Sequence, residues 1–258
     1  MSSVQNKSIL ITGATGVLGQ LICNRLESAH TLYKLKGDIC DRQSVIDSIP
    51  NNLDIVIHLA AIVPTSTVNE NPIRAFDVNV GGTINLITAL QNQKNPPFLF
   101  YASTSHVYKS SDQQICENSP IEPVSLYGKT KYLAEAIVTH AYPSDFCIGR
   151  IFSFYHETQT GGFLYPTIKK RLAKEDLDQP FDLYGADSIR DFLPAEIVCK
   201  YIAHLCLKNK TGVYNIASGQ PTVISDFVQQ LTLKQLHINK KGKPDTLIAN
   251  IDKLKAVL

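Results

Sequence analysis

Charge of one sign is what this sequence lacks most clearly. Its 258 residues include 25 Lys and Arg against 23 Asp and Glu, which gives a formal net charge of +2 at pH 7, and no basic run exceeds a few residues. Proteins that bind nucleic acid present a clustered positive surface to the phosphates. The near balance therefore argues against a nucleic-acid partner and favours chemistry on small molecules.

Long apolar runs are also missing. No stretch approaches the roughly 18 consecutive apolar residues that a membrane span needs. The polar segment 1–7 leads directly into the first apolar run and does not resemble an export signal. We therefore expect a cytoplasmic protein with no membrane partner.

Metal-ligand spacing is absent among the cysteines. None of them belongs to a CxxC pair, and four lie inside apolar segments, which is typical of reduced core residues in the cytosol. The sequence predicts reduced thiols and no metal site. The cysteines are Cys23, Cys40, Cys116, Cys147, Cys199 and Cys206.

Short apolar runs alternate with helical patterns from the first residues onward. This alternation predicts strand-helix units and an α/β fold with a parallel sheet. Segment 54–61 is a mostly apolar run, as expected for a strand buried on both faces. The expected strands are 8–12, 32–39, 54–61, 98–102 and 145–153, the last completing the main sheet, and the expected helices are 18–26, 41–49, 72–90 and 126–140.

Beyond about residue 154, Gly and Pro break the pattern into short elements. Helical stretches remain near 167–174, 194–207 and 225–236. We expect a nucleotide-binding domain at 1–153 and a smaller substrate-binding lobe at 154–258, with segments that return to the sheet. Such a lobe would lie at the carboxyl ends of the strands, where open α/β sheets bind ligands.

Three glycines lie between the first strand and the first helix. Gly13 allows a tight turn, Gly16 leaves room for a pyrophosphate, and Gly19 permits close packing of the helix on the strand. The spacing is GxxGxxG, and its position predicts a dinucleotide cofactor. The predicted cofactor contacts in this loop are Gly13, Thr15, Gly16, Val17 and Leu18.

Asp38 has two interpretations. It lies 38 − 19 = 19 residues beyond the last glycine, close to the roughly 20 expected of an acid that binds the ribose hydroxyls of NAD. In the second interpretation, which we prefer, Asp38 and Ile39 end a third strand and contact adenine. The segment before them then contains Lys34 and Lys36 and no clear acid, which slightly favours NADP over NAD.

Tyr127 and Lys131 are four residues apart in a predicted helix, so they share one face. A free tyrosine titrates near about pH 10, and proton transfer at neutral pH requires lowering its pKa by roughly three units, or about 4 kcal/mol. A lysine charge at about 5 Å contributes roughly 3 kcal/mol toward this at an effective dielectric constant of about 20. The pair therefore predicts a tyrosine with a lowered pKa.

In their order along the chain, the motifs resemble the extended short-chain dehydrogenase/reductase family of nucleotide-sugar epimerases, dehydratases and reductases. The resemblance implies a Rossmann-type doubly wound parallel sheet with a small C-terminal substrate-binding lobe, an NAD(P) cofactor and a homodimer formed through the two helices 72–90 and 126–140. The matching segments are 13–19, 37–39, 58–61, 78–83, 103–108, 127–131, 190–192 and 214–219.

The resemblance also implies roles for individual residues. Thr104 hydrogen-bonds the reacting sugar oxygen, Tyr127 exchanges a proton with that oxygen, and Lys131 binds the nicotinamide ribose. Asn79 lies near the cofactor, or is a helix-interior amide that faces a neighbouring loop. Further cofactor contacts are Leu59, Ala60 and Ala61.

The substrate contacts implied by the resemblance are Ser105, His106 and Arg190. Ser105 and His106 stand where family dehydratases carry an acidic pair, which argues against dehydration. We favour a role for His106 in hydrogen-bonding the substrate or in packing against the strand end. The alternative is that it removes a carbon-bound proton. Arg190 binds a diphosphate, or pairs with Asp191.

The chain departs from the family pattern at Ser153 and Phe163, where asparagine is usual, and this bears on substrate identity. The compact length and the shortened second strand look most like reductases of 4-keto-6-deoxy nucleotide sugars. We therefore expect NAD(P)-dependent reduction at C4 of a nucleotide sugar with Tyr127 as proton donor. The alternatives are a nucleotide-sugar 4-epimerase and a non-catalytic, cofactor-binding regulatory protein.

Overall fold

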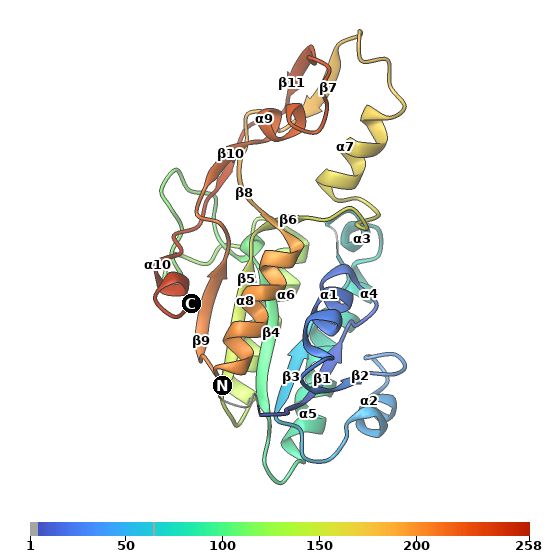
Figure 1. Ribbon diagram of the computed structural model, residues 1–258, viewed down its shortest axis with the longest axis vertical. Coiled ribbons are helices and arrows are strands. Elements are labelled where there is room, and N and C mark those ends of the chain that lie inside the picture. The colour runs from blue at the N-terminus through green and yellow to red at the C-terminus, as the bar shows by residue number, and fades with distance from the viewer. Residues whose placement is uncertain (1–4, 64) are drawn as a thin grey trace.

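The computed structural model describes residues 5–63 and 65–258. The first four residues of the predicted 1–153 domain lie outside this part of the chain. The main sheet has six parallel strands in the order β2-β1-β3-β4-β5-β9, which confirms the predicted α/β class (Figure 1). Its strands are β1 (Ser8–Thr12), β2 (Thr31–Lys34), β3 (Ile55–His58), β4 (Phe98–Thr104), β5 (Phe146–Ile151) and β9 (Gly212–Ile216).

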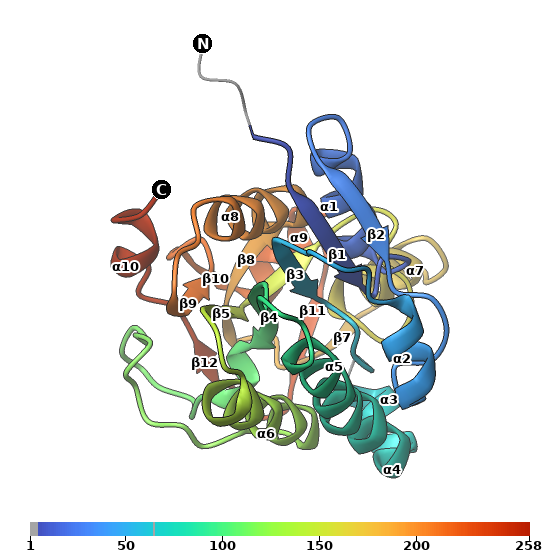
Figure 2. The ribbon, with the colours of Figure 1, turned by 90° about the horizontal axis from the view of Figure 1, so that it is seen from below.

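Helices cover both faces of this sheet. α1 (Val17–Leu26) and α8 (Ala195–Leu207) lie on one face, and α5 (Gly82–Gln91) and α6 (Leu126–Ala141) lie on the other, with α2 (Arg42–Ser48) near the β2 edge (Figure 2). Every residue of β3 and β4 is buried, as expected for strands covered on both sides. The two apolar layers form two separate cores, one under each helix pair.

The predicted helix 72–90 is one helical run with an irregular centre. It consists of α4 (Pro72–Phe76), a π-helical turn η1 (Asp77–Gly81) and α5, and is preceded by α3 (Thr65–Glu70). π turns inside helices often lie at functional sites. Here the irregular turn contains Asn79, whose surroundings are described below.

The prediction of a third strand ending at Asp38 is wrong. One strand, β2, lies between α1 and α2, and Asp38 belongs to the loop that follows it. Within the described residues β2 is the edge strand of the sheet beside β1. The chain turns away after Leu35 because Gly37 adopts φ of +81°, a left-handed conformation that favours glycine, and Asp41 then caps α2.

Segments after residue 154 both form a smaller lobe and return to the main sheet. Strand 145–153 does not complete the sheet as expected, because β9 pairs with β5 and α8 packs on α1. β7, β11, α7 and α9 lie together at the upper end of Figure 1 around a small core of their own. The remaining elements are β6 (Ser153–Tyr155), α7 (Leu164–Leu172), β7 (Phe181–Tyr184), β8 (Ile189–Pro194), β10 (Pro221–Val223), α9 (Ile224–Gln229), β11 (Ile238–Lys241), β12 (Thr246–Leu247) and α10 (Asp252–Lys255).

The six cysteines are free, as predicted, and four of them are buried. Within residues 5–63 and 65–258, no cluster of three or more His, Cys, Asp or Glu side chains is arranged to hold a metal ion. None of the helices in that part is both long and apolar enough to span a membrane.

Candidate active site

The glycine loop forms a cradle at the start of α1. Gly13 has φ of +69°, and a Cβ there would come within 2.7 Å of the Ala60 nitrogen. A Cβ on Gly19 would lie 2.2 Å from the Gly13 carbonyl oxygen, so α1 and the loop are in direct backbone contact. Gly16 differs, because its Cβ would meet only the Gly13 oxygen, at 3.4 Å, and otherwise points into open space.

This geometry fits a dinucleotide. Thr15 and Gly16 are exposed, and Gly16 caps α1 without any side-chain hydrogen bond, so the first N–H groups of the helix remain available to an anion. Val17 and Leu18 form the partly buried first turn. The residues present therefore fit the pyrophosphate of a dinucleotide.

The segment after β3 lies directly against this loop. The Ala60 amide donates a hydrogen bond to the Thr12 hydroxyl at 3.1 Å, and the Leu59 amide donates to the Thr12 carbonyl at 3.3 Å. Leu59, Ala60 and Ala61 are partly exposed at the carboxyl end of β3, where the sheet order reverses relative to the chain. Ligands of open α/β sheets bind at this position.

Asp38 lies beside the same edge and forms an ion pair. Its carboxylate accepts from Arg74 at 2.6 Å and from the Cys40 amide at 2.9 Å, and both contacts hold its pKa below the usual range. Ile39 is buried, its side chain packs on Gly82, and its carbonyl accepts from Asn85 at 3.1 Å. Of this pair, Asp38 is therefore the side chain that is accessible to a ligand.

Thr104 and Tyr127 meet at the carboxyl end of β4. Thr104 is buried, and its hydroxyl is placed to hydrogen-bond the phenol of Tyr127. Tyr127 lies in the first turn of α6, where Ser125 caps the helix by accepting from the Gly128 amide at 3.0 Å. A Cβ on Gly128 would lie 2.1 Å from the His106 carbonyl oxygen, so this glycine lets α6 approach the β4 end.

The predicted direction of the Tyr127 pKa is wrong for the protein alone. Burial raises the pKa of Tyr127, and only the Thr104 hydroxyl opposes this effect. Lys131 is not among the groups that lower it, and its Nζ lies over the ring of Tyr101, 4.3 Å from the ring centroid. Burial lowers the pKa of Lys131 itself to about 7, while Glu135 acts in the opposite direction.

Asn79 fixes the Tyr127 helix to the loop after β3. Its Oδ1 accepts from the Ile62 amide at 2.7 Å, and its Nδ2 donates to the Ile62 carbonyl at 3.2 Å and to the Thr130 hydroxyl at 3.0 Å. The side chain is thus the loop-facing amide of the two alternatives described above. A contact between Asn79 and a cofactor stays a prediction.

His106 lies edge-on against Tyr127, with ring centroids 5.8 Å apart. Its Nδ1 is 3.1 Å from the Ser125 hydroxyl, which already accepts from the Gly128 amide. When the Ser125 hydroxyl donates to Nδ1, the imidazole proton lies on Nε2. Burial and nearby Arg190 lower the pKa of His106, which favours the neutral imidazole, and its role toward a substrate stays a prediction.

Arg190 is held by an acid that the sequence analysis did not identify. Its Nη2 donates to the two carboxylate oxygens of Asp245 at 2.7 and 2.9 Å, so the alternative pairing with Asp191 is wrong. Asp191 is buried and instead accepts from Ser218 and Gly219. Arg190 lowers and Asp245 raises the pKa of His106, so the charges of this pair reach the proton-handling residues.

The other predicted substrate positions lie around this centre. Ser105 is buried at the start of the short helix η2 (Ser105–Val107) that follows β4. Ser153 begins β6, and Phe163 is the residue before α7, both partly exposed. The chain segment from β5 to α7 therefore contains both departures from the family pattern.

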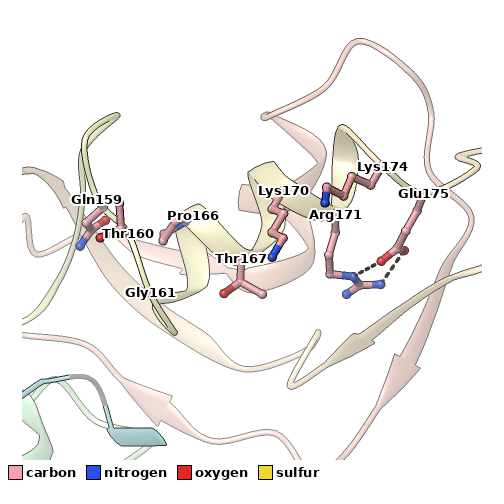
Figure 3. A pocket seen from close by; sticks show the side chains of 9 residues that line it. All are labelled: Gln159, Thr160, Gly161, Pro166, Thr167, Lys170, Arg171, Lys174 and Glu175. Atoms are coloured by element: carbon pink, nitrogen blue, oxygen red, sulfur yellow. Dashed lines mark hydrogen bonds and ion pairs between the residues drawn. The ribbon is translucent and has the colours of Figure 1, made fainter. Parts of the chain in front are cut away.

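A cavity of about 720 Å³ lies on the exposed side of α7 (Figure 3). None of the predicted site residues lines it. Its arginine, Arg171, is held by Glu175 at 2.6 Å and 3.0 Å and by the Asp182 carbonyl at 2.8 Å. The lining residues are Gln159, Thr160, Gly161, Pro166, Thr167, Lys170, Arg171, Lys174 and Glu175.

Ser125, Gly128 and Asp245 are site residues that the sequence analysis missed. Ser125 had a readable signal, since a serine just before a helical pattern is a typical N-cap. Gly128 and Asp245 had none, because their roles depend on a neighbour about 20 and 55 positions away along the chain.

Comparison with known proteins gives a consistent result. Residues 9–217 match the NAD dependent epimerase/dehydratase family. UDP-glucose 4-epimerase of Mycoplasma genitalium is 29% identical over 257 residues, covering 85% of this chain and 74% of that protein. GDP-6-deoxy-D-mannose reductase of Pseudomonas aeruginosa is 26% identical over 240 residues, covering 86% and 78%.

The fold is also that of a solved structure. The structure of RMD from Pseudomonas aeruginosa complexed with NADPH superposes with a TM-score of 0.86 at 21% identity, covering 98% of this chain and 92% of that one. At this identity the likeness concerns the fold alone.

Proposed function

Because the chain belongs to the NAD dependent epimerase/dehydratase family, we propose that it is an NAD(P)-dependent enzyme that reduces the 4-keto group of a 6-deoxy nucleotide sugar. The chain is a nicotinamide-dependent enzyme of the nucleotide-sugar epimerase and reductase group. We propose the direction of the reaction, the class of sugar and the preferred cofactor.

The placement of the Tyr127 phenol beside the Thr104 hydroxyl, at the carboxyl end of β4, carries this proposal. A phenol whose pKa is raised by burial holds its proton at neutral pH, as a proton donor must. Reduction of a ketone creates an alkoxide that needs this proton, whereas oxidation of an alcohol first needs a base. The Thr104 hydroxyl beside the phenol would hold the same oxygen.

The remaining residues hold the reactants. The bound nicotinamide would supply the hydride, and the Gly13 to Leu18 loop would bind its pyrophosphate. Lys131 would contact the nicotinamide ribose. The Nε2–H of His106 would donate to a sugar oxygen, and Arg190, fixed by Asp245, would bind the diphosphate.

NADPH is the proposed cofactor by a narrow margin. Lys34 and Lys36 are exposed beside the end of β2, the edge at which a 2′-phosphate would lie. Asp38 is already neutralised by Arg74, which weakens it as a partner for the two ribose hydroxyls of NAD.

The test is direct. The purified chain would be mixed with NADPH or NADH and with dTDP-, GDP- and UDP-linked 4-keto-6-deoxy sugars, and absorbance at 340 nm would be followed. Stoichiometric loss of absorbance with one keto sugar is expected. Turnover of a nucleotide sugar without net loss of reduced cofactor would overturn the reductase assignment.

A 4-epimerase is the second candidate, and one observation favours it. UDP-glucose 4-epimerases of two Mycoplasma species are 28 to 29% identical to this chain. An epimerase recycles its cofactor, so UDP-glucose and UDP-galactose would interconvert with catalytic NAD. If neither assay shows turnover while cofactor binds, the non-catalytic regulatory alternative gains.

We also propose that the chain forms a homodimer and that its second lobe binds the substrate. Apolar side chains are exposed on α4, α5 and α6, the helices expected to form a homodimer, and such a face normally has a partner. A substrate-binding lobe at 154–258 fits the position of β7, α7 and α9 beyond the sheet (Figure 1). The exposed apolar residues are Ile73, Ile84, Tyr132 and Leu133.

A further inference from the structure

A fully buried ion pair lies one helical turn beyond Lys131. Glu135 in α6 is 3% exposed and Arg150 in β5 is 6% exposed. Arg150 donates to both carboxylate oxygens, from Nη2 at 2.7 Å and from Nε at 3.0 and 3.3 Å. The hydroxyl of Ser103 in β4 also donates to Glu135. The carboxylate is thus held from two strands.

Further polar contacts complete this network. The second amino group of Arg150 donates to the Tyr108 hydroxyl at 2.9 Å and to the Glu117 carbonyl at 3.1 Å. The Tyr108 hydroxyl in turn donates to Asn215 at 2.7 Å. Every member has a hydrogen-bond partner, so the Glu135 side chain is held in a fixed position in spite of its burial.

Glu135 is the charged group that acts on Lys131. His58 in β3 is neutral, because burial and Lys131 lower its pKa to about 3, and both ring nitrogens are engaged by Thr12 at 2.7 Å and Thr83 at 3.0 Å. The phenols of Tyr101 and Tyr127, from β4 and α6, hold their protons because burial raises the pKa of each.

The buried ammonium of Lys131 therefore has little compensation from its surroundings. It is 2% exposed and lies over the Tyr101 ring, which attracts a cation only weakly. Glu135 follows it by four positions in α6, a spacing at which side chains face each other. Within the described residues, no other carboxylate acts on its charge state.

We propose that Glu135 is a positioning residue that keeps Lys131 protonated, and that Arg150 limits how strongly it does so. The pair would set the pH above which the catalytic helix loses its cation. This inference deepens the proposed function and rests on it only for the effect on turnover. The charge state of Lys131 is measurable without substrate.

The observed pKa direction supports the proposal. Burial places the pKa of Lys131 near 7, inside the physiological range, so a modest change in the local field decides whether the ammonium persists. Glu135 raises that pKa, and Arg150 competes for the same carboxylate.

The experiment is an NMR titration of the Lys131 side-chain Cε–Hε resonance in protein labelled at lysine, with the signal assigned by its loss in Lys131→Met. Glu135→Gln should lower the pKa of Lys131 by about one unit or more, and Arg150→Gln should raise it, since the freed carboxylate then turns to Lys131. The double variant, a neutral pair, should lie between them.

Opposite changes of the Lys131 pKa in the two single variants distinguish this role from a purely structural one. A network that only supported packing would move both single variants in the same direction or leave the pKa unchanged, and either result in folded protein overturns the proposal. Ser103→Ala, which retains both charges, should change the pKa by less than about 0.3 unit. If Glu135→Gln does not fold, the Lys131 pKa can still be compared among wild type, Arg150→Gln and the double variant.

Activity separates this inference from the proposed function. The upper limb of the pH profile of kcat/KM should follow the Lys131 pKa, to lower pH in Glu135→Gln and to higher pH in Arg150→Gln. If the resonance shifts as expected while the profile does not move, the role of Lys131 in turnover fails and the Glu135 assignment stands.

Discussion

The proton-handling edge of the main sheet and the second lobe are built differently. At the edge, Thr104, Asn79 and Lys131 are each at most 6% exposed, and backbone approaches such as Gly128 on His106 leave no room for a Cβ. In the lobe, α7 presents Thr167, Lys169 and Lys170 to solvent over a small core. The contrast teaches that the proposed proton-handling residues are fixed by burial, while the second lobe presents a more exposed surface.

The largest expected effect is at the buried edge. Tyr127→Phe removes the proton donor without changing the shape of the ring, so kcat should fall by about 10³-fold. Cofactor affinity should stay within a few fold, measured by fluorescence titration with NADPH. A variant that retains more than a tenth of wild-type kcat would show that another group supplies the proton, and His106 would be the first to test.

Burial of Lys131 should also be visible in stability. Its pKa is about 7 in the folded chain against 10.5 ordinarily, so between these values the unfolded chain binds more protons. The free energy of unfolding contributed by this group is therefore reduced below about pH 7 and recovers as pH rises toward about 10. Lys131→Met should stabilise the protein by a few kcal/mol at pH 6.

The measurement is urea unfolding of wild type and Lys131→Met at several pH values. The difference between the two should shrink as pH rises from 7 to 10, which isolates Lys131 from the cysteines and tyrosines that titrate in both proteins. Tyr132→Phe, at an exposed neighbouring position, is the control and should change stability little. A constant difference across pH would contradict the assigned pKa.

Two glycines of one loop should respond differently to the same change. Gly19→Ala places a Cβ 2.2 Å from the Gly13 oxygen and should cost about 3 kcal/mol of stability. Gly16→Ala meets nothing closer than 3.4 Å and should fold normally but bind NADPH more weakly. Equal losses of stability would mean that both glycines serve packing alone, and the cofactor assignment of Gly16 would fail.

Sequence reasoning succeeded where a function depends on local backbone geometry. The glycine loop lies between β1 and α1 as predicted, and Tyr127 and Lys131 share α6 because helical spacing alone places them together. The resemblance to extended short-chain dehydrogenases correctly identified the family. These features need only a few neighbouring residues, so a pattern of ten or twenty positions predicts them.

Sequence reasoning failed where a pKa depends on burial or where the partner of a residue lies far away along the chain. The lysine was expected to lower the pKa of Tyr127, but the fold desolvates both groups and turns the ammonium toward Tyr101. The pairing of Arg190 with Asp245 and the pairing of β9 with β5 join segments more than 50 residues apart, and although a return to the sheet was expected, its strand was not identified. Neither desolvation nor such pairing leaves a periodic signal in the sequence.

The smallest effects are expected in the second lobe, where two ion pairs allow a matched comparison. Asp245→Asn releases Arg190, so KM for the nucleotide sugar should rise about tenfold with kcat within a few fold, because bidentate phosphate contacts depend on a fixed guanidinium. Asp187→Asn breaks the Lys240 pair, which has the shorter separation of 2.6 Å but is about half exposed, and should change neither parameter measurably. Initial rates across a range of substrate concentrations check both variants. If the two variants have the same kinetic parameters, the Arg190–Asp245 pair has no special role in substrate binding. Arg190 would then belong with the exposed lobe and not with the buried edge around Thr104.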